Sequence, residues 1–200
     1  PVYDRWVEFA RSLDLPVQFG TGEDTDEPLP KVFRRASAVI TTSVAEGFGM
    51  SYLEPWLAGR PLVGRNLPPI TRDFEEYGVS LSHLYDRVDV PLEWVGSQEL
   101  RQRLESGLRE YRSSYGADTT DEDIEKARAS LVRDGAVDFG RLDEPLQEKV
   151  IRRGDRESAP ASDVCPAHPG SPSRAEAPLE ENRRAVRENF NPRVYGRRLL

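Results

Sequence analysis

The sequence predicts a mixed α/β fold built on a parallel sheet, and two observations lead to this prediction. Residues 38–44 are apolar and β-branched, which is typical of a buried strand in a parallel sheet. Segments with apolar residues at helical spacing lie on both sides of it, and Gly59 and Pro61 mark the end of the helix that follows. Alternating strands and helices favour parallel pairing, because each helix carries the chain back to the edge where the next strand begins.

The N-terminal elements follow from the same spacing rules. Val2, Trp6, Ala10 and Leu13 recur at helical intervals and predict a first helix. A short strand is expected over residues 16–20, an acidic loop over 22–27, a helix over 29–36 and the buried strand over 38–44. The next helix is expected over residues 50–57, with a mild kink at Pro55, and a further strand begins at Leu62.

After Gly96 the pattern becomes helical. Helices are expected over residues 97–115, 121–133 and 142–152. Residues 154–178 are rich in Pro, Ser, Ala and Gly and predict a disordered or loosely held loop, and a helix broken near Asn191 and Pro192 follows over 179–200. The predicted organisation is a partial sheet domain (1–96), a helical insertion (97–153), a loop (154–178) and a closing helix (179–200).

Composition narrows the function classes. The 200 residues carry a net charge of −7 with acidic and basic residues interspersed, which gives no reason to expect nucleic-acid binding, since a basic patch is its usual footprint. The single cysteine, Cys165, cannot form an internal disulfide, which favours a reducing, cytoplasmic setting. No apolar run approaches the roughly 18 residues that a membrane span needs.

The strongest functional signal is a glycine-rich turn between the predicted strand at 38–44 and the predicted helix at 50–57. Gly47 and Gly49 let the backbone turn tightly and approach a ligand without a Cβ in the way. The amides of Met50 and Ser51 would then lie at a helix N-terminus, where unpaired N–H groups and a partial positive charge favour phosphates. The turn is therefore a candidate diphosphate site.

Two carboxylates flank this turn, eight positions apart. Glu54 lies about one helical turn beyond the glycines, where it can accept hydrogen bonds from ribose hydroxyls. Glu46 lies at the end of the predicted strand, the usual ligand edge of a parallel sheet, and can reach hydroxyls of a sugar. A purely structural interpretation also stays open, because Gly-x-Gly turns are common and Glu is a good helix former.

The wider stretch resembles the nucleotide-binding half of retaining glycosyltransferases with the GT-B fold, the large glycogen-synthase-like group. Glu46 and Glu54 match the E-x(7)-E motif of that family. The other matching positions are Ser43, Gly47, Phe48, Gly49, Leu53, Ala58, Gly59, Pro61, Leu62 and Val63. The close match covers a minor part of the chain, and a looser similarity to the family's closing helix returns over residues 189–200.

The resemblance implies a Rossmann-like parallel sheet, the C-terminal half of a GT-B fold, with additional C-terminal helices. It implies that Glu46 is the catalytic candidate and contacts the donor sugar, and that Glu54 binds ribose. The other donor-binding residues that it implies are Gly47, Phe48, Gly49, Met50 and Ser51.

The implied reaction is transfer of a hexose from a nucleotide sugar to an acceptor with retention of anomeric configuration. The resemblance implies no cofactor besides the donor substrate and no metal. It also implies that the family's first strand–helix unit, with its diphosphate-binding Arg and Lys, and an acceptor domain precede Pro1. The chain alone is then expected to be inactive, and any peripheral membrane contact is expected only through those regions. Two alternatives stay open: a non-catalytic sugar-nucleotide-binding module, and an epimerase or phosphorylase of the same fold.

Other polar residues have ordinary explanations. The acids of Asp121-Glu-Asp123 open a predicted helix, where they favour its dipole. His83 is expected at the surface or in packing, and Cys165 and His168 lie in the predicted loop. Arg65 and Asn66 follow the strand at Leu62 and either contact a ligand or, as the more common case, build the loop.

Overall fold

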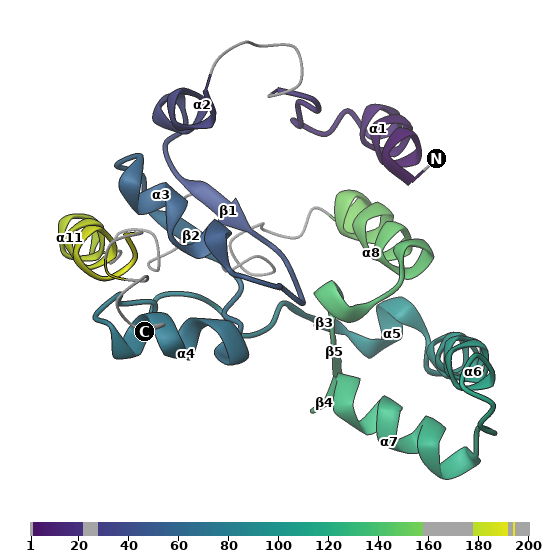
Figure 1. Cartoon of the computed structure of the whole chain (residues 1–200). Helices are drawn as coiled ribbons and strands as arrows, with labels where there is room; N and C mark the ends of the chain where they lie inside the picture. The colour runs from purple at the N-terminus through teal and green to yellow at the C-terminus, as the bar shows by residue number, and fades with distance from the viewer. Residues whose placement is uncertain (1, 22–27, 158–177, 192–193, 195–200) are drawn as a thin grey trace. The chain divides into compact units, whose positions relative to one another are not determined.

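The computed structural model describes residues 2–21, 28–157, 178–191 and 194 (Figure 1). Its contacts divide the chain into two units. The first contains Pro1–Asp86 and Ala161–Leu200, and the second contains Arg87–Pro160. The first unit has mixed α/β structure with a parallel pair of strands, and the second has a separate antiparallel sheet, so the predicted α/β class is confirmed at this level.

The first unit is built around two parallel strands. Val39 of β1 (Val39–Thr41) pairs with Leu62 of β2 (Leu62–Gly64), and Thr41 pairs with Gly64. The helices of this unit are α1 (Val2–Ser12), α2 (Leu29–Arg35), the 3₁₀ turn η1 (Met50–Tyr52), α3 (Glu54–Leu57), α4 (Pro68–Glu76) and α11 (Leu179–Asn189). Strand and helix therefore alternate from β1 through α3 to β2, as the sequence predicts, and α4, which was not predicted, follows β2.

The core of the first unit lies around the two aromatic residues of η1 and α3. Tyr52 and Trp56 are fully buried and pack with Leu62, Leu81 and Val186. His83 is also buried, with Nε2 2.9 Å from the carbonyl oxygen of Leu62 and its ring edge-on to Trp56. The histidine thus has the packing role that the sequence indicates.

Helix α11, yellow in Figure 1, lies against α3 and closes this core. Asn182 on α11 is fully buried. Its Oδ1 accepts from the backbone N–H of Ser80 at 2.7 Å, and its Nδ2 donates to the carbonyl oxygen of Ser80 at 2.8 Å. This pair of bonds fixes a helix to a segment 102 positions earlier in the chain.

The second unit contains a three-stranded antiparallel sheet in the order β3 (Asp89–Pro91), β5 (Ala136–Asp138) and β4 (Val132–Arg133). Its helices are α5 (Leu92–Val95), α6 (Ser97–Ser113), α7 (Asp121–Leu131), the 3₁₀ turn η2 (Phe139–Arg141) and α8 (Glu144–Glu157). Val95, Leu100, Val137 and Leu146 are buried in its core. The helical insertion predicted over residues 97–153 contains α6, α7 and most of α8, and also β4 and β5, which were not predicted because strands of two or three residues are too short to show alternation.

The acids at 121–123 belong to a helix start. Thr120 is the N-cap of α7, and its side chain and that of Asp123 bond each other's backbone N–H groups in a capping box. The hydrogen bond from the Thr120 N–H is the largest cause that lowers the pKa of Asp123 to about 2. The Asp123 carboxylate therefore caps the N-terminus of α7, a structural role of the kind expected from the sequence.

Three predicted elements differ from the structure in the first unit. Residues 16–20 form no strand, because strand-forming side chains need a paired neighbour and no described residue supplies one. The strand expected over 38–44 is limited to β1, and Ile40 in it is 53% exposed rather than buried. The helix expected over 50–57 is split into η1 and α3, since Leu53 has a φ of −110° and Pro55 has no N–H to bond the preceding turn.

The C-terminal predictions are only partly covered by the described residues. Helix α8 runs to Glu157, so the first residues of the loop expected over 154–178 are helical instead. Residues 158–177, with Cys165 and His168, lie outside the described residues, and so do most positions after Asn191. Helix α11 ends at Asn189, close to the predicted break.

Candidate functional site

The candidate site is the loop between β1 and α3, which carries Glu46. The side-chain hydroxyl of Ser43 donates to Oε1 of Glu46 at 3.0 Å. The hydroxyl of Ser51 donates to the same oxygen, also at 3.0 Å. One carboxylate oxygen thus has two donors, one from each side of the loop, and the three side chains form a cluster that we call the Ser–Glu clamp.

Gly49 makes this cluster possible. Its φ of +67° and ψ of 24° are left-handed, and a Cβ there would lie 2.3 Å from Cγ2 of Ile70 and 3.0 Å from the ring of Phe74. A residue with a side chain therefore meets both backbone strain and a clash with α4. The left-handed residue turns the chain into η1, which places Ser51 beside Glu46.

The other predicted residues of the turn are open to solvent. Phe48 is 90% exposed and Met50 is 52% exposed, so neither side chain belongs to the core. A Cβ on Gly47 would meet no atom within 4 Å, so the described residues alone give no steric reason for glycine there. A ligand could therefore approach the backbone of Gly47 without meeting another side chain of the described residues.

The amides expected to face phosphates lie at the start of η1. The first bonds of this turn run from the Tyr52 N–H to the Gly49 carbonyl and from the Leu53 N–H to the Met50 carbonyl. The N–H groups of Met50 and Ser51 therefore precede the first intrahelical bond. Because η1 has three residues and α3 has four, the strong helix dipole expected here is absent, and an anion would depend on individual amide donors.

Glu54 is the first residue of α3 and is partly exposed. The proline that follows it begins the buried face of this short helix, together with Trp56. The anchor of Glu54 is thus rigid, because Trp56 is fully buried and its indole N–H donates to the Tyr52 carbonyl at 2.8 Å.

Tyr52, the residue after Ser51, anchors the site loop in the core. Its phenol donates to the carbonyl oxygen of Arg65 at 2.8 Å and is fully buried. Burial raises the pKa of Tyr52 to about 12, and the charge of the nearby Glu46 acts in the same direction. Neither the role of Tyr52 nor that of Ser43 was predicted from the sequence, although Ser43 lies only three residues before Glu46.

Tyr52 should therefore titrate late. Its pKa is above the ordinary value of 10, so the neutral phenol stabilises the folded state fully below pH 10, and that contribution is lost as the pH rises from 10 to 12. In an ultraviolet titration of tyrosinate absorbance, we expect a step near pH 12 that is missing in Tyr52→Phe. Identical titration curves for the two proteins would show that Tyr52 is not buried in this way.

Arg65 and Asn66 serve the loop after β2. The Arg65 side chain is 5% exposed, donates to the carbonyl oxygen of Asp86 at 3.1 Å and lies over the ring of Tyr85. The Asn66 amide donates to Oδ1 of Asp86 at 3.1 Å and accepts from the Thr71 hydroxyl at 2.6 Å. Both side chains therefore hold the loop together. Of the two interpretations left open by the sequence, ligand contact or loop structure, these bonds favour loop structure.

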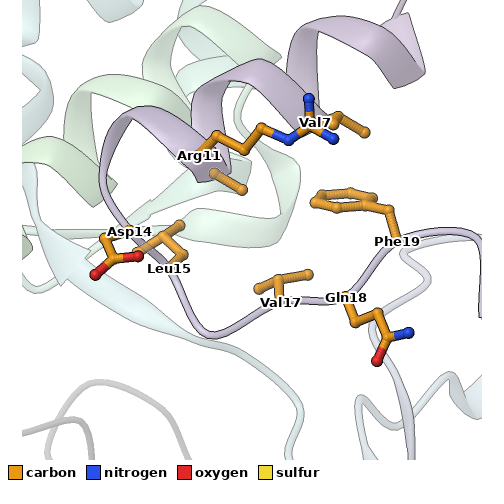
Figure 2. Close-up of a pocket in the computed structure, with 8 residues that line it drawn as sticks. Val7, Arg11, Asp14, Leu15, Val17, Gln18 and Phe19 are labelled. Atoms are coloured by element: carbon orange, nitrogen blue, oxygen red, sulfur yellow. The ribbon is translucent and has the colours of Figure 1, made fainter.

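A separate hollow of about 370 Å³ lies between α1 and the segment that follows it (Figure 2). Val7, Leu15 and Phe19 are among its apolar lining residues, and Arg11 and Asp14 are charged members. It contains none of the residues of the Glu46–Glu54 stretch. The hydrogen bonds of Glu46 define the candidate site, because they gather polar side chains at the end of a strand, whereas the hollow lacks such a cluster.

The chain was compared with models of protein families, with curated proteins and with solved structures, and no comparison gave a match. In the described part of the chain, no three His, Cys, Asp or Glu side chains gather in a way that would hold a metal ion. None of the described helices is both long enough and apolar enough to cross a bilayer.

Proposed function

We propose that this chain is the nucleotide-sugar-binding part of a retaining glycosyltransferase with a GT-B fold, which transfers a hexose to an acceptor. The observation that carries the proposal is the Ser–Glu clamp. It holds Glu46 beside the Gly-Phe-Gly turn at the carboxyl end of β1, the edge where parallel sheets bind ligands. The E-x(7)-E resemblance supports the same assignment, and in this proposal β1 and β2 are neighbouring strands of a larger Rossmann-like sheet.

Each part of the loop has a role in donor binding. Glu46 accepts hydrogen bonds from hydroxyls of the donor sugar, because an ionised carboxylate is an acceptor only. The N–H groups of Met50 and Ser51 donate to the diphosphate. Glu54, anchored on α3, accepts from ribose hydroxyls. The backbone of Gly47 and Gly49 and the exposed Phe48 line the same turn.

The chemistry that follows is electrostatic. Departure of the nucleoside diphosphate leaves negative charge on its phosphate oxygens, and fixed N–H donors stabilise that charge in the transition state. Amide donors of a short 3₁₀ turn give less stabilisation than a long helix, so the proposed enzyme needs additional cations at the diphosphate. We place the reaction in the cytoplasm and assign it no resident cofactor.

A binding module without catalysis uses the same donor contacts, and turnover distinguishes it from the enzyme. In a transfer assay with a panel of acceptors, the enzyme forms a glycoside with the anomeric configuration of the donor. If the natural full-length protein binds the donor but forms no glycoside, it is a binding module.

The direct test of the site is Glu54→Gln in a calorimetric titration with nucleoside diphosphate hexoses that carry uracil, guanine or adenine. We expect one donor class to bind the wild type, and we expect the variant to lose about 1–3 kcal/mol, the worth of a hydrogen bond to a charged group. Glu75→Gln on the exposed face of α4 is the matched control and should bind like the wild type. A wild type that binds none of these donors, or a variant with unchanged affinity, contradicts the proposal.

A further inference from the structure

The two serines of the Ser–Glu clamp reach Glu46 from different segments. Ser43 lies in the loop after β1, three positions before Glu46, and Ser51 lies in η1, five positions after it. Both hydroxyls donate to Oε1, at 3.0 Å each. Two donors on one oxygen restrict the rotation of the carboxylate, since turning the carboxylate breaks or stretches both bonds.

The anchors of the two serines are rigid in different ways. Ser43 lies two positions after Thr41 of β1. The carbonyl oxygen of Thr41 accepts from the N–H of Arg65, the residue that follows β2, at 3.0 Å. Ser51 precedes Tyr52, which is fully buried and bonded to the Arg65 carbonyl. Through the two serines, the Glu46 carboxylate is therefore held in place by β1 on one side and by the buried Tyr52 on the other, although most of the loop is exposed.

We propose that Ser43 and Ser51 are positioning residues that fix Glu46 for the sugar part of the donor and leave the nucleotide part unaffected. The proposal rests on the proposed function, because it assigns a sugar hydroxyl to Glu46. With Oε1 occupied by the two serines, Oε2 is the oxygen that accepts from the sugar. Binding of the hexose then depends on the clamp, while the diphosphate and ribose depend on the amides of η1 and on Glu54.

The test compares two affinities in each protein: that for the nucleoside diphosphate hexose and that for the nucleoside diphosphate alone. Their ratio measures what the sugar adds. In the Ser43→Ala/Ser51→Ala double variant we expect the ratio to fall about tenfold, the effect of losing about one oriented charged hydrogen bond. The affinity for the nucleoside diphosphate alone should change by less than about twofold, well below the tenfold change expected in the ratio.

Two further variants separate positioning from a general structural role. Ser43→Thr keeps the hydroxyl and should restore the ratio in the presence of Ser51. Ser37→Ala removes an exposed serine of the same unit outside the clamp and should leave both affinities unchanged. Melting curves of all variants show whether the first unit stays folded.

The outcomes are distinct. A fall of the ratio with unchanged nucleoside diphosphate affinity supports the positioning role. An unchanged ratio in the double variant overturns it, and so does a parallel loss of both affinities, which indicates a structural role only. A wild type that binds neither ligand overturns the proposed function itself and this inference with it.

Discussion

Gly64→Ala is expected to destabilise the first unit by about 4 kcal/mol or more, a cost seen only for severe backbone or core defects. Gly64 has a φ of +135°, which side-chain-bearing residues rarely adopt. A Cβ at this position would lie 2.0 Å from the carbonyl oxygen of Thr41 and 2.8 Å from its nitrogen. Both are backbone atoms of β1, so no rotamer change relieves the clash and the β1–β2 pair must separate.

The measurement is urea denaturation followed by tryptophan fluorescence in a Trp94→Phe background, because Trp94 is buried in the second unit and would otherwise contribute beside Trp56 of the first. Gly47→Ala is the matched control, because its added Cβ meets no atom within 4 Å, and we expect it to change the stability by less than about 1 kcal/mol. Because Ser43 and Glu46 follow β1, loss of the pair should also disorder the Ser–Glu clamp. Equal unfolding midpoints for Gly64→Ala and the wild type contradict the close parallel pairing of β1 and β2.

Asn182→Ala is expected to cost about 2–4 kcal/mol, since it leaves the backbone N–H and carbonyl of Ser80 without their partner. Asn182 is fully buried, and its two bonds of 2.7 and 2.8 Å are the polar link between α11 and residue 80. Loss of this link loosens α11, which covers α3 and the core around Trp56. The site loop then loses part of its support.

Asn189→Ala is the matched control, because it also removes a side-chain amide from α11 but at a less buried position. Asn189 lies on the same helix and is only half-buried, and the bond that its amide donates to the Tyr77 carbonyl at 3.0 Å is open to solvent. Water replaces an exposed partner at low cost, so we expect a loss of about 0.5–1 kcal/mol. Chemical denaturation of the two variants side by side gives the comparison. Similar losses in both would mean that Asn182 is not buried against Ser80 as described.

The first unit shows which features of the fold the sequence predicts. The β-branched run over residues 38–44 and the apolar segment at Leu62 predicted a parallel sheet, because the residue types that favour a buried strand can be read from a short stretch of sequence. The pairing covers only Val39–Thr41 of that run. The strand expected over residues 16–20 failed for a non-local reason: a strand forms only when another strand pairs with it. The break at Leu53 was underestimated, since the effect of Pro55 depends on the φ of the residues before it.

The second unit contains a local hairpin signal that did not enter the prediction from the sequence. Asp134 and Gly135, with φ of 50° and 75°, form the two-residue turn between β4 and β5. An Asp-Gly pair between short apolar segments is a strong local indication of a hairpin. The helical spacing on both sides of this pair concealed it.

The short stretch that holds the candidate site was chosen from the sequence, but its split helix and its side-chain contacts were not predicted. Spacing alone brought Glu46, the two glycines and Glu54 together, because they lie in one short stretch. The contact of Ser51 with Glu46 spans five positions and depends on the left-handed turn at Gly49, which sequence spacing does not specify. The solvent exposure of Phe48 and Met50 likewise depends on the path of the loop.

The central claim is that the loop around Glu46 binds a nucleoside diphosphate hexose, and amide chemical-shift mapping tests it most directly. The ¹⁵N-labelled chain is titrated with the donor, and the amides of α6 in the second unit serve as the internal reference. We predict that the largest shifts occur at Gly47, Gly49, Met50, Ser51 and Glu54, with small shifts along α6. Shifts confined to other segments, such as the hollow beside Val7 and Phe19, or no shifts at all, would contradict the claim.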